Sequence, residues 1–174
     1  MKPTILIVDD EKSTRDGLRI ALEDKYETFI AKDATEAARL MHDVKPDGVL
    51  TDLRMAGEDG MAVIDRALKL SPQPVCIMMT AYGDVETAVK AMNKGAYWFL
   101  QKPVDLRQLE IVLERGLKAR TNEKEVVALK TRLDKKFSLG EVIGSSDALQ
   151  KAIEQVRTVA PSNATILLLG ETGT

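Results

Sequence analysis

The sequence lacks several features that would assign it to a specialised class of protein. It has one cysteine, Cys76, so it can form no disulfide framework, and a reducing compartment is expected. No apolar run approaches the roughly 20 residues that span a bilayer, and the start leaves no room for the apolar stretch of a signal peptide. With 25 basic and 27 acidic residues, the chain has no basic excess typical of nucleic-acid binding. These absences indicate a cytoplasmic protein without a membrane partner.

What the sequence does contain is an alternation of apolar runs and amphipathic segments. The apolar runs cover residues 4–8, 27–31, 48–52, 74–79 and 97–100, and the segments with helical spacing cover residues 13–24, 33–43, 59–70, 84–93 and the stretch from 105 onward. This alternation predicts an α/β fold with a doubly wound parallel five-stranded sheet and helices on both faces. The more polar second run favours an edge position, as in the flavodoxin-like strand order 2-1-3-4-5.

Polar side chains stand at the ends of these apolar runs. Because the carboxyl ends of parallel strands meet at one edge of a sheet, where open α/β folds place their ligands, these side chains are expected to gather there. They are Asp9 and Asp10 after the first run, Asp52 at the end of the third, Thr80 after the fourth and Lys102 after the fifth. Asp52, which ends the apolar run that begins at Gly48, is the candidate reactive group.

Three carboxylates placed this close together repel one another unless a cation binds between them. Oxygen ligands suit Mg²⁺, whereas the single histidine, His42, lies on a different predicted helix and argues against zinc. A lysine and a hydroxyl beside a metal-bound carboxylate form a site for a phosphoryl group, because the cations neutralise its oxygens. Asp52 is then expected to be the nucleophile that forms an aspartyl-phosphate, with Lys102 and Thr80 beside it.

Each of these residues also has a purely structural interpretation. Asp9 or Asp59 could cap a helix, Lys102 could be a surface charge, and Thr80 could be a hydroxyl at the edge of the core. Their joint occurrence at consecutive strand ends favours the functional interpretation.

On these motifs, residues 1–120 resemble the receiver domain of response regulators in two-component signalling. The matching motifs are Val8-Asp9-Asp10-Glu11, Thr51-Asp52-Leu53-Arg54-Met55, Thr80-Ala81-Tyr82 and Lys102-Pro103. The resemblance implies that a sensor histidine kinase transfers phosphate to Asp52. It also implies that Asp10, Asp52 and the main-chain carbonyl of Arg54 bind Mg²⁺, that Asp9 acts nearby or through water, and that the peptide bond before Pro103 is cis.

The same resemblance assigns a conformational switch to Thr80 and to the aromatic residue three positions before the lysine, Phe99. Many members of the family have tyrosine at that position. Phe99 has no hydroxyl, so its rotation would change packing only, and the face that includes Tyr97 and Trp98 is expected to carry part of the signal.

The last helix of the receiver is predicted to continue as a linker. Leucines recur at helical spacing at its start, and apolar residues return after a polar gap. They are Leu106, Leu109, Leu113 and Leu117, followed by Val126, Leu129 and Leu133. This pattern predicts a self-pairing seam and a homodimer through residues 105–135. The alternative is a solvated charged helix, which Gly116 and the Thr121-Asn122 pair favour.

The sequence changes character from Phe137. Residues 147–160 are predicted to form an amphipathic helix and residues 165–169 a strand, and Gly170, Glu171, Thr172, Gly173 and Thr174 match the start of a P-loop that is incomplete here. With the motifs at residues 142–146 and 159–161, this part resembles the NtrC-like activators, in which a receiver and a helical linker precede an AAA+ ATPase that remodels sigma-54 RNA polymerase.

These resemblances divide the chain into a receiver domain (1–120), a helical linker (121–136) and the N-terminal fragment of an AAA+ domain (137–174). The chain is therefore expected to be a regulatory module and not an enzyme, with Mg²⁺ as its cofactor. ATP, sigma-54 RNA polymerase and DNA would be bound only by missing domains of a longer parent protein.

The sequence argues against two other functions that use an aspartate at the end of a strand or this fold. A phosphatase of the haloacid-dehalogenase type would have a second aspartate two residues after Asp52, where this sequence has Arg54. A flavin-binding flavodoxin-like module would need a phosphate loop after the first strand, where Asp9, Asp10 and Glu11 would repel a phosphate.

Overall fold

The fold is seen in a computed structural model, which describes residues 2–81, 85–136 and 146–160 together with Thr165, Leu167 and Leu169. The chain divides into two compact units, Met1–Glu125 and Val126–Thr174, and each is considered by itself. No helix among the described residues is both long enough and apolar enough to cross a bilayer.

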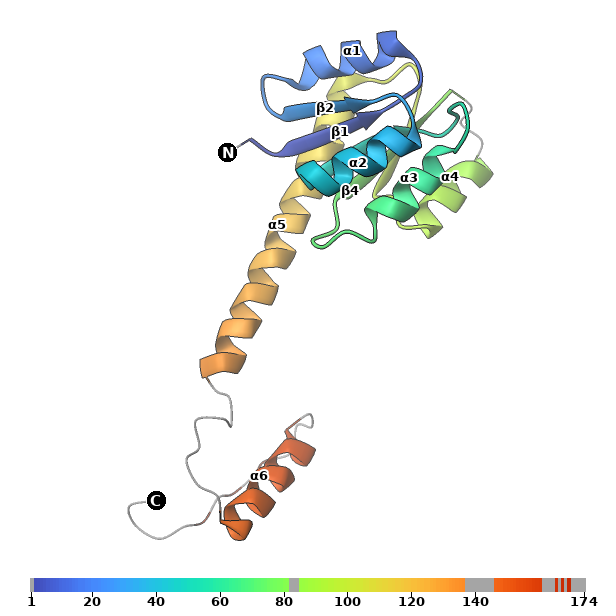
Figure 1. Ribbon diagram of the computed structural model, residues 1–174. Helices are drawn as coiled ribbons and strands as arrows, with labels where there is room; N and C mark the ends of the chain where they lie inside the picture. The colour runs from blue at the N-terminus through green and yellow to red at the C-terminus, as the bar shows by residue number, and fades with distance from the viewer. Residues whose placement is uncertain are drawn as a thin grey trace. The chain divides into compact units, whose positions relative to one another are not determined.

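The first unit is built on a parallel five-stranded sheet (Figure 1). Its strands are β1 (Thr4–Val8), β2 (Glu27–Ala31), β3 (Gly48–Asp52), β4 (Val75–Thr80) and β5 (Trp98–Gln101). They pair in the order β2-β1-β3-β4-β5, and every pairing is parallel. The predicted fold class and strand order are confirmed.

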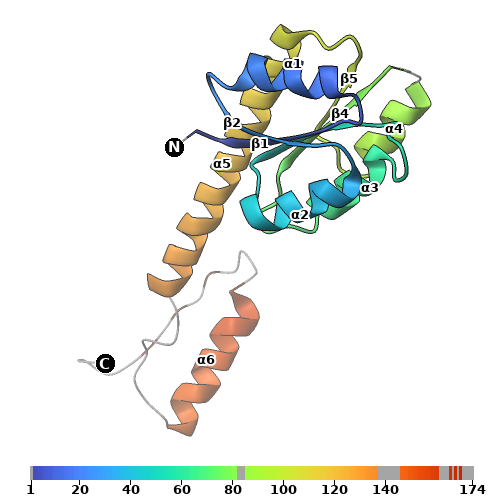
Figure 2. The same cartoon turned by 45° about the horizontal axis from the view of Figure 1, so that its top comes forward.

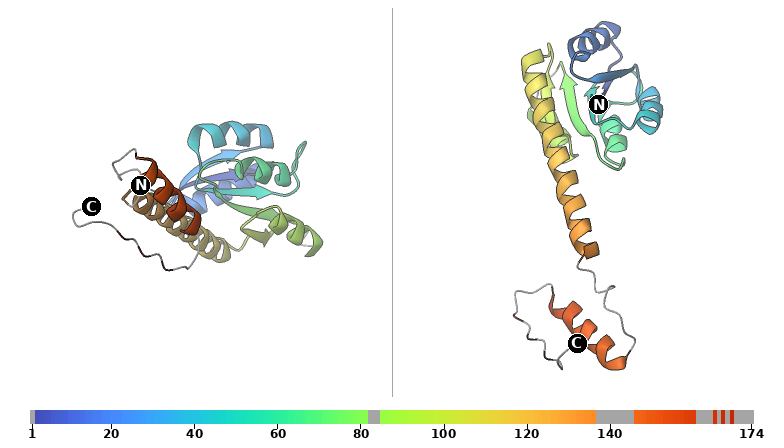
Figure 3. Two further views of the ribbon diagram at one scale, coloured as in Figure 1. Left: turned by 90° about the horizontal axis from the view of Figure 1, so that it is seen from below. Right: turned by 90° about the vertical axis from the view of Figure 1, so that its left-hand side faces the viewer.

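Helices cover both faces of this sheet. They are α1 (Lys12–Leu22), α2 (Ala34–Val44), α3 (Gly60–Ala67), α4 (Val85–Asn93) and α5 (Leu106–Lys136). The buried leucines of α1 and α5 pack on one face, and buried apolar residues of α2, α3 and α4 pack on the other. Figure 2 shows α1 above the sheet and α2 and α3 below it, and Figure 3 shows α5 and α2 on opposite sides. The central strands β3 and β4 are buried along their whole length, because both of their faces are covered.

Local signals in the sequence account for several element boundaries. The Asp33 carboxylate caps α2 by accepting a hydrogen bond from Glu36 N at 2.8 Å, as the capping-box spacing predicts. The Glu36 carboxylate reaches back and accepts from Lys32 N at 2.9 Å, one residue before the N-cap position of an ideal capping box. Asp59 caps α3 by accepting from Ala62 N at 3.1 Å, so the structural role considered for this residue is confirmed. The Asp33 and Asp59 side chains thus satisfy N–H groups that the first turn of a helix leaves without partners.

Helix α5 is one continuous helix of 31 residues, but the leucine seam predicted along it is wrong at its start. Leu109 and Leu113 are fully buried in the core of the first unit against β4 and β5 residues, and Leu117 packs on the same cluster. Only Leu106 of the four is exposed. Helical spacing alone does not distinguish a face that packs on its own sheet from one that pairs with a second helix. The side chains of Val126, Leu129 and Leu133 lie outside the described residues.

In the second unit the helix predicted for residues 147–160 is present as α6 (Asp147–Val159), and Ser146 caps it by accepting from Leu149 N. The strand predicted for residues 165–169 is not seen at its described positions. Leu167 and Leu169 are 79% and 87% exposed and belong to no strand. A buried strand needs neighbours that complete its hydrogen bonds, and no strand is described in residues 126–174. Residues 170–174, predicted to begin a P-loop, lie outside the described residues.

Candidate functional site

The side chains predicted to gather at one edge of the sheet do so. Asp9 and Asp10 directly follow β1, Asp52 ends β3, Thr80 ends β4, and Lys102 directly follows β5. Because these strands are adjacent and parallel, their carboxyl ends form one rim. Asp9, Asp52 and Thr80 are buried, whereas Asp10 is exposed.

Lys102 joins two of the carboxylates. Its Nζ lies 2.7 Å from Asp9 Oδ2 and 2.7 Å from Asp52 Oδ2, and its side chain is only 17% exposed. Burial by itself would lower the pKa of Lys102, but the hydrogen bonds to Asp52 and Asp9 outweigh it and raise the pKa. The ammonium therefore stays charged beside Asp52. The structural alternative considered for Lys102, an unattached surface charge, does not describe this contact.

Both oxygens of the Asp9 carboxylate accept short hydrogen bonds. Oδ1 accepts a hydrogen bond from Glu11 N at 2.9 Å, and Oδ2 accepts from Lys102. Burial raises the pKa of Asp9, and the hydrogen bond from Lys102 opposes this shift without cancelling it. Asp9 is therefore held as a partner for the lysine, with less freedom than Asp10 to bind another group.

The acidic cluster has the donor chemistry of a site for a hard divalent cation. Asp9, Asp10 and Asp52 each offer a carboxylate oxygen, and these oxygens lie within 4.8 Å of one another. Asp10 Oδ2 accepts a hydrogen bond from Ala56 N at 3.2 Å, and Asp52 Oδ1 accepts a long one from Arg54 N at 3.4 Å. An all-oxygen set of this kind suits Mg²⁺, which uses one or two carboxylates and keeps several waters. The residues present thus fit the ion.

Close packing positions the loop that follows Asp52. Gly60 N donates to Leu53 O at 2.9 Å, and a β-carbon at Gly60 would lie 2.0 Å from the carbonyl oxygen of Asp52. Only glycine allows this approach. The peptide bond between Lys102 and Pro103 is cis, as the resemblance implied.

The two residues of the expected switch lie on neighbouring strands. Thr80 is opposite Gln101 and Phe99 is opposite Met78 in the β4–β5 pairing. Phe99 is partly buried against the core, whereas Tyr97 and Trp98 are 38% and 43% exposed. The role of this face in signalling stays a prediction.

Sequence reasoning missed Arg15. Its Nη1 donates to the carbonyl oxygen of Asp9 at 2.5 Å, reaching back from α1 to the end of β1. That carbonyl belongs to the peptide unit that joins Asp9 to Asp10, so the contact fixes the plane from which Asp10 projects. The spacing of Arg15 from the two aspartates was visible in the sequence, but the direction of its side chain was not.

An open parallel α/β sheet with an acidic, lysine-bridged rim defines a class of phosphoryl- or cation-binding module, and comparison with known proteins identifies the family. The sequence model of the family described as "Response regulator receiver domain" matches residues 5–114. This chain belongs to the response regulator receiver family.

Curated relatives match over nearly the whole chain. The regulatory protein AtoC of Escherichia coli is 35% identical over 171 residues, which are 98% of this chain and 37% of AtoC. The transcriptional regulatory protein ZraR of Salmonella typhimurium is 37% identical over 174 residues, which are 99% of this chain and 38% of ZraR. The chain thus spans less than two fifths of the length of these relatives.

Solved structures agree. NtrX from Brucella abortus has a TM-score of 0.70 and 34% identity, covering 94% of this chain and 36% of NtrX. The receiver domain of a LuxO repressor protein from Vibrio parahaemolyticus has a TM-score of 0.68 and 28% identity, covering 72% of this chain and 98% of that domain.

Proposed function

We propose that this chain is the input module of a two-component response regulator, in which Asp52 accepts phosphate from a sensor histidine kinase. The observation that carries the proposal is the contact of Lys102 Nζ with Asp52 Oδ2 and Asp9 Oδ2. It holds a positive charge beside the oxygen that would become phosphorylated. In this role the chain is a phosphate acceptor and not an enzyme.

An oxygen of Asp52 attacks the phosphorus of a phosphohistidine, a P–O bond forms, and the P–N bond breaks as the imidazole leaves. Lys102 moves from the carboxylate to a phosphoryl oxygen, and the Thr80 hydroxyl donates to another. A Mg²⁺ ion held by Asp10, Asp52 and the main-chain carbonyl of Arg54 would neutralise the charge on those oxygens.

A groove beside Lys102 is a suitable docking site for a helix of the kinase that donates the phosphate. Its volume is about 620 Å³, and it lies between α1 and the loop from β5 to α5, with an apolar lining that includes Leu18, Val104 and Leu106. Gly17 also lines it, and a β-carbon there would meet nothing within 4 Å. An amphipathic helix of the donor fits such a surface.

This docking site is tested with Gly17→Arg, which fills the groove without disturbing the core. Transfer from the cognate kinase is expected to fall at least tenfold, while phosphorylation by acetyl phosphate stays unchanged because that donor needs no groove. Equal rates from both donors in the variant and the wild type would exclude the groove as the docking site.

An exposed apolar surface supports pairing of two chains as the output. Six exposed apolar side chains lie on α4, at the start of β5 and the residue before it, and on the first turns of α5, and they are Val89, Met92, Tyr97, Trp98, Leu106 and Ile111. Phosphorylation near Thr80 would reshape this surface and so alter how two protomers pair through it and through the linker in residues 105–135.

The regulated target proposed here is a downstream AAA+ ATPase that activates sigma-54-dependent transcription. The relatives are regulatory and transcriptional regulatory proteins more than twice as long as this chain. Binding of ATP, RNA polymerase and DNA would belong to the rest of such a protein.

Beryllofluoride with Mg²⁺, which mimics an acyl phosphate, tests the module. The oligomeric state, measured by light scattering, is expected to change in the wild type and to stay constant in Asp52→Ala. A chain that remains a monomer with and without the mimic would contradict the pairing, and absence of Asp52 phosphorylation by any phosphodonor would contradict the whole proposal.

A further inference from the structure

Helix α5 is fastened to the receiver by Arg120, at the end of the sheet opposite Asp52. The guanidinium donates from Nε to Gln73 O at 2.6 Å and from Nη2 to Pro72 O at 3.3 Å, and its Nη1 forms an ion pair with the Asp47 carboxylate. The Arg120 side chain is only 11% exposed. A planar guanidinium bound to three acceptors defines a helix position more tightly than one contact does.

The acceptor Asp47 is itself held by the backbone of two strands. Its Oδ2 accepts from Thr4 N at 3.0 Å, and its N–H donates to Thr4 O at 2.7 Å. Its carbonyl accepts from Val75 N at 2.9 Å. Arg120 is therefore attached to the rigid start of β1, β3 and β4, and not to a side chain that is free to follow the helix.

One turn earlier, Gly116 brings α5 unusually close to the sheet. A β-carbon at Gly116 would lie 2.6 Å from Val75 Cγ1 and 3.0 Å from Tyr97 Cε1. Residues four apart lie on the same face of a helix, so Gly116 and Arg120 meet the sheet together. We call the contacts of these two residues with Asp47, Gln73 and Val75 the α5 anchor.

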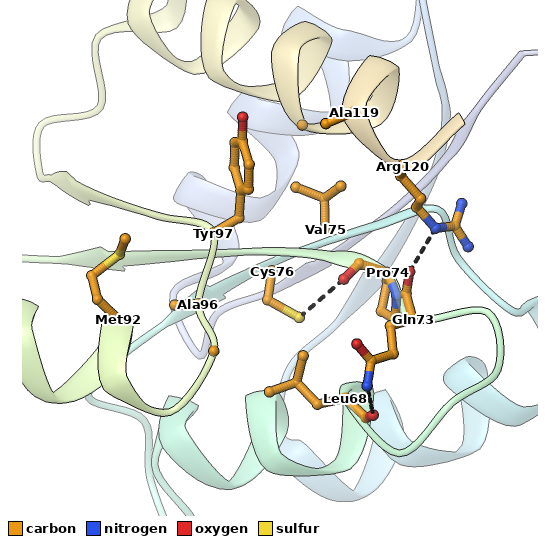
Figure 4. A pocket seen from close by; sticks show the side chains of 12 residues that line it. Leu68, Gln73, Pro74, Val75, Cys76, Met92, Ala96, Tyr97, Ala119 and Arg120 are labelled. Atoms are coloured by element: carbon orange, nitrogen blue, oxygen red, sulfur yellow. Dashed lines mark hydrogen bonds between the residues drawn. The ribbon is translucent and has the colours of Figure 1, made fainter. Parts of the chain in front are cut away.

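Apolar packing beyond the anchor is incomplete. A cavity of about 410 Å³ lies beside it, and its lining includes Leu68, Cys76, Met92 and Ala119 (Figure 4). Figure 4 shows Arg120 bonded to the loop at one side of this space and Tyr97 at another. Side chains do not fill this space, so the hydrogen bonds and the ion pair of Arg120 hold α5 at its edge, in addition to the packing of Gly116 and Leu117 on the sheet.

The two strands that carry the site begin at the anchor. β3 starts directly after Asp47 and ends at Asp52, and β4 starts at Val75 and ends at Thr80. We propose that the α5 anchor transmits changes at Asp52 and Thr80 to the linker helix, with Arg120 as the positioning residue. This inference rests on the proposed phosphorylation of Asp52, and it assigns the transmission to one end of two buried strands.

Spin labels test the anchor in the full 174-residue chain. Cys76 is buried, and burial raises the pKa of its thiol to about 12, so labels go only to cysteines placed at exposed positions of the first unit, His42→Cys on α2 and Glu125→Cys on α5. Dilution with unlabelled chain restricts the measured distances to single chains. The width of the distance distribution is expected to at least double in Arg120→Met and in Asp47→Asn, and to stay unchanged in Lys118→Met, an exposed control on the same helix.

Both variants keep the residues of the phosphorylation site, and urea unfolding confirms that each is folded. Asp47→Asn retains an oxygen for Thr4 N, so it isolates the ion pair from the β1 contact. If the distance distribution in Arg120→Met is as narrow as in the wild type, Arg120 does not fix the position of α5 and the proposal is contradicted. Lys118→Met broadened as much as Arg120→Met also overturns it, because any change on α5 would then suffice.

The transmission is measured by adding beryllofluoride and Mg²⁺. Binding is followed by ¹⁹F NMR, and the wild-type distance is expected to shift while Arg120→Met binds the mimic without that shift. An equal shift in Arg120→Met contradicts transmission through Arg120. Binding without a shift in the wild type contradicts transmission by this route but leaves phosphorylation intact, whereas failure of any phosphodonor to modify Asp52 contradicts the proposed function itself.

Discussion

The carbonyl oxygen of Asp52 lies only 2.0 Å from where a β-carbon of Gly60 would be, so the first residue of α3 packs directly on the backbone of the candidate phosphoacceptor. Asp52 is therefore positioned by its own strand and also by the helix that follows it. Any side chain at residue 60 must move one or the other.

Gly60→Ala is expected to lower the free energy of unfolding by about 1–3 kcal/mol, the usual cost of overpacking, and to weaken Mg²⁺ binding because the Asp52 backbone is displaced. The matched control is Gly17→Ala in the middle of α1, where nothing lies within 4 Å. It should stabilise the protein by about 0.5–1 kcal/mol. Urea unfolding and Mg²⁺ titration calorimetry measure both effects; a Gly60→Ala protein as stable as the wild type would contradict the close approach.

The buried carboxylate of Asp9 gives the metal-free protein a defined pH dependence. Burial raises its folded-state pKa above the ordinary 3.8, so between these two values the folded state binds more protons than the unfolded state. The contribution of Asp9 to stability therefore falls as pH rises through this window. Urea unfolding from pH 3.5 to 7 in the presence of EDTA should show a steeper loss in the wild type than in Asp9→Asn. Parallel curves for the two proteins would show that Asp9 has no raised pKa.

Arg15 is expected to set the affinity for Mg²⁺ through the peptide plane between Asp9 and Asp10. Losing a group that orients a ligand typically costs about tenfold or more in metal affinity, so Arg15→Met should raise the Kd for Mg²⁺ by about tenfold. Arg19→Met is the control, because Arg19 is one turn further along α1 and exposed. Calorimetric titration gives both constants, and equal affinities in the two variants would rule out this role.

Leu113 should behave as a core residue and Leu106 as a surface residue, although both belong to the same leucine pattern. Leu113 is fully buried and Leu106 is 46% exposed. Leu113→Ala is expected to cost about 2–5 kcal/mol in the free energy of unfolding, and Leu106→Ala less than about 1 kcal/mol. Unfolding curves at several protein concentrations separate this loss from any effect on pairing. A loss of less than about 1 kcal/mol in Leu113→Ala would contradict its burial in the core and favour a position in a surface seam.

The alternation of strands and helices, the strand order and the rim of candidate residues could all be predicted from the sequence. They are local properties, because a strand end is marked by the residue at which an apolar run stops, and parallel strands deliver their ends to one edge. The capping residues Asp33 and Asp59 are local in the same way. Which side chains bond to one another at the rim, such as the two carboxylates that share Lys102, could be learned only from the structure.

What only the tertiary structure decided are contacts between residues far apart in the chain and the choice of what covers an apolar face. Arg120 and Asp47 are 73 residues apart, and neither carries a pattern that names the other. The leucine spacing in α5 predicted an apolar stripe. Whether a sheet or a second helix covers this stripe depends on where α5 lies. By itself, then, the sequence determined the fold class and the place of Asp52. Tertiary packing decided how Asp52 is held and where the linker helix is fastened, because hydrophobic periodicity records a buried face without recording its partner.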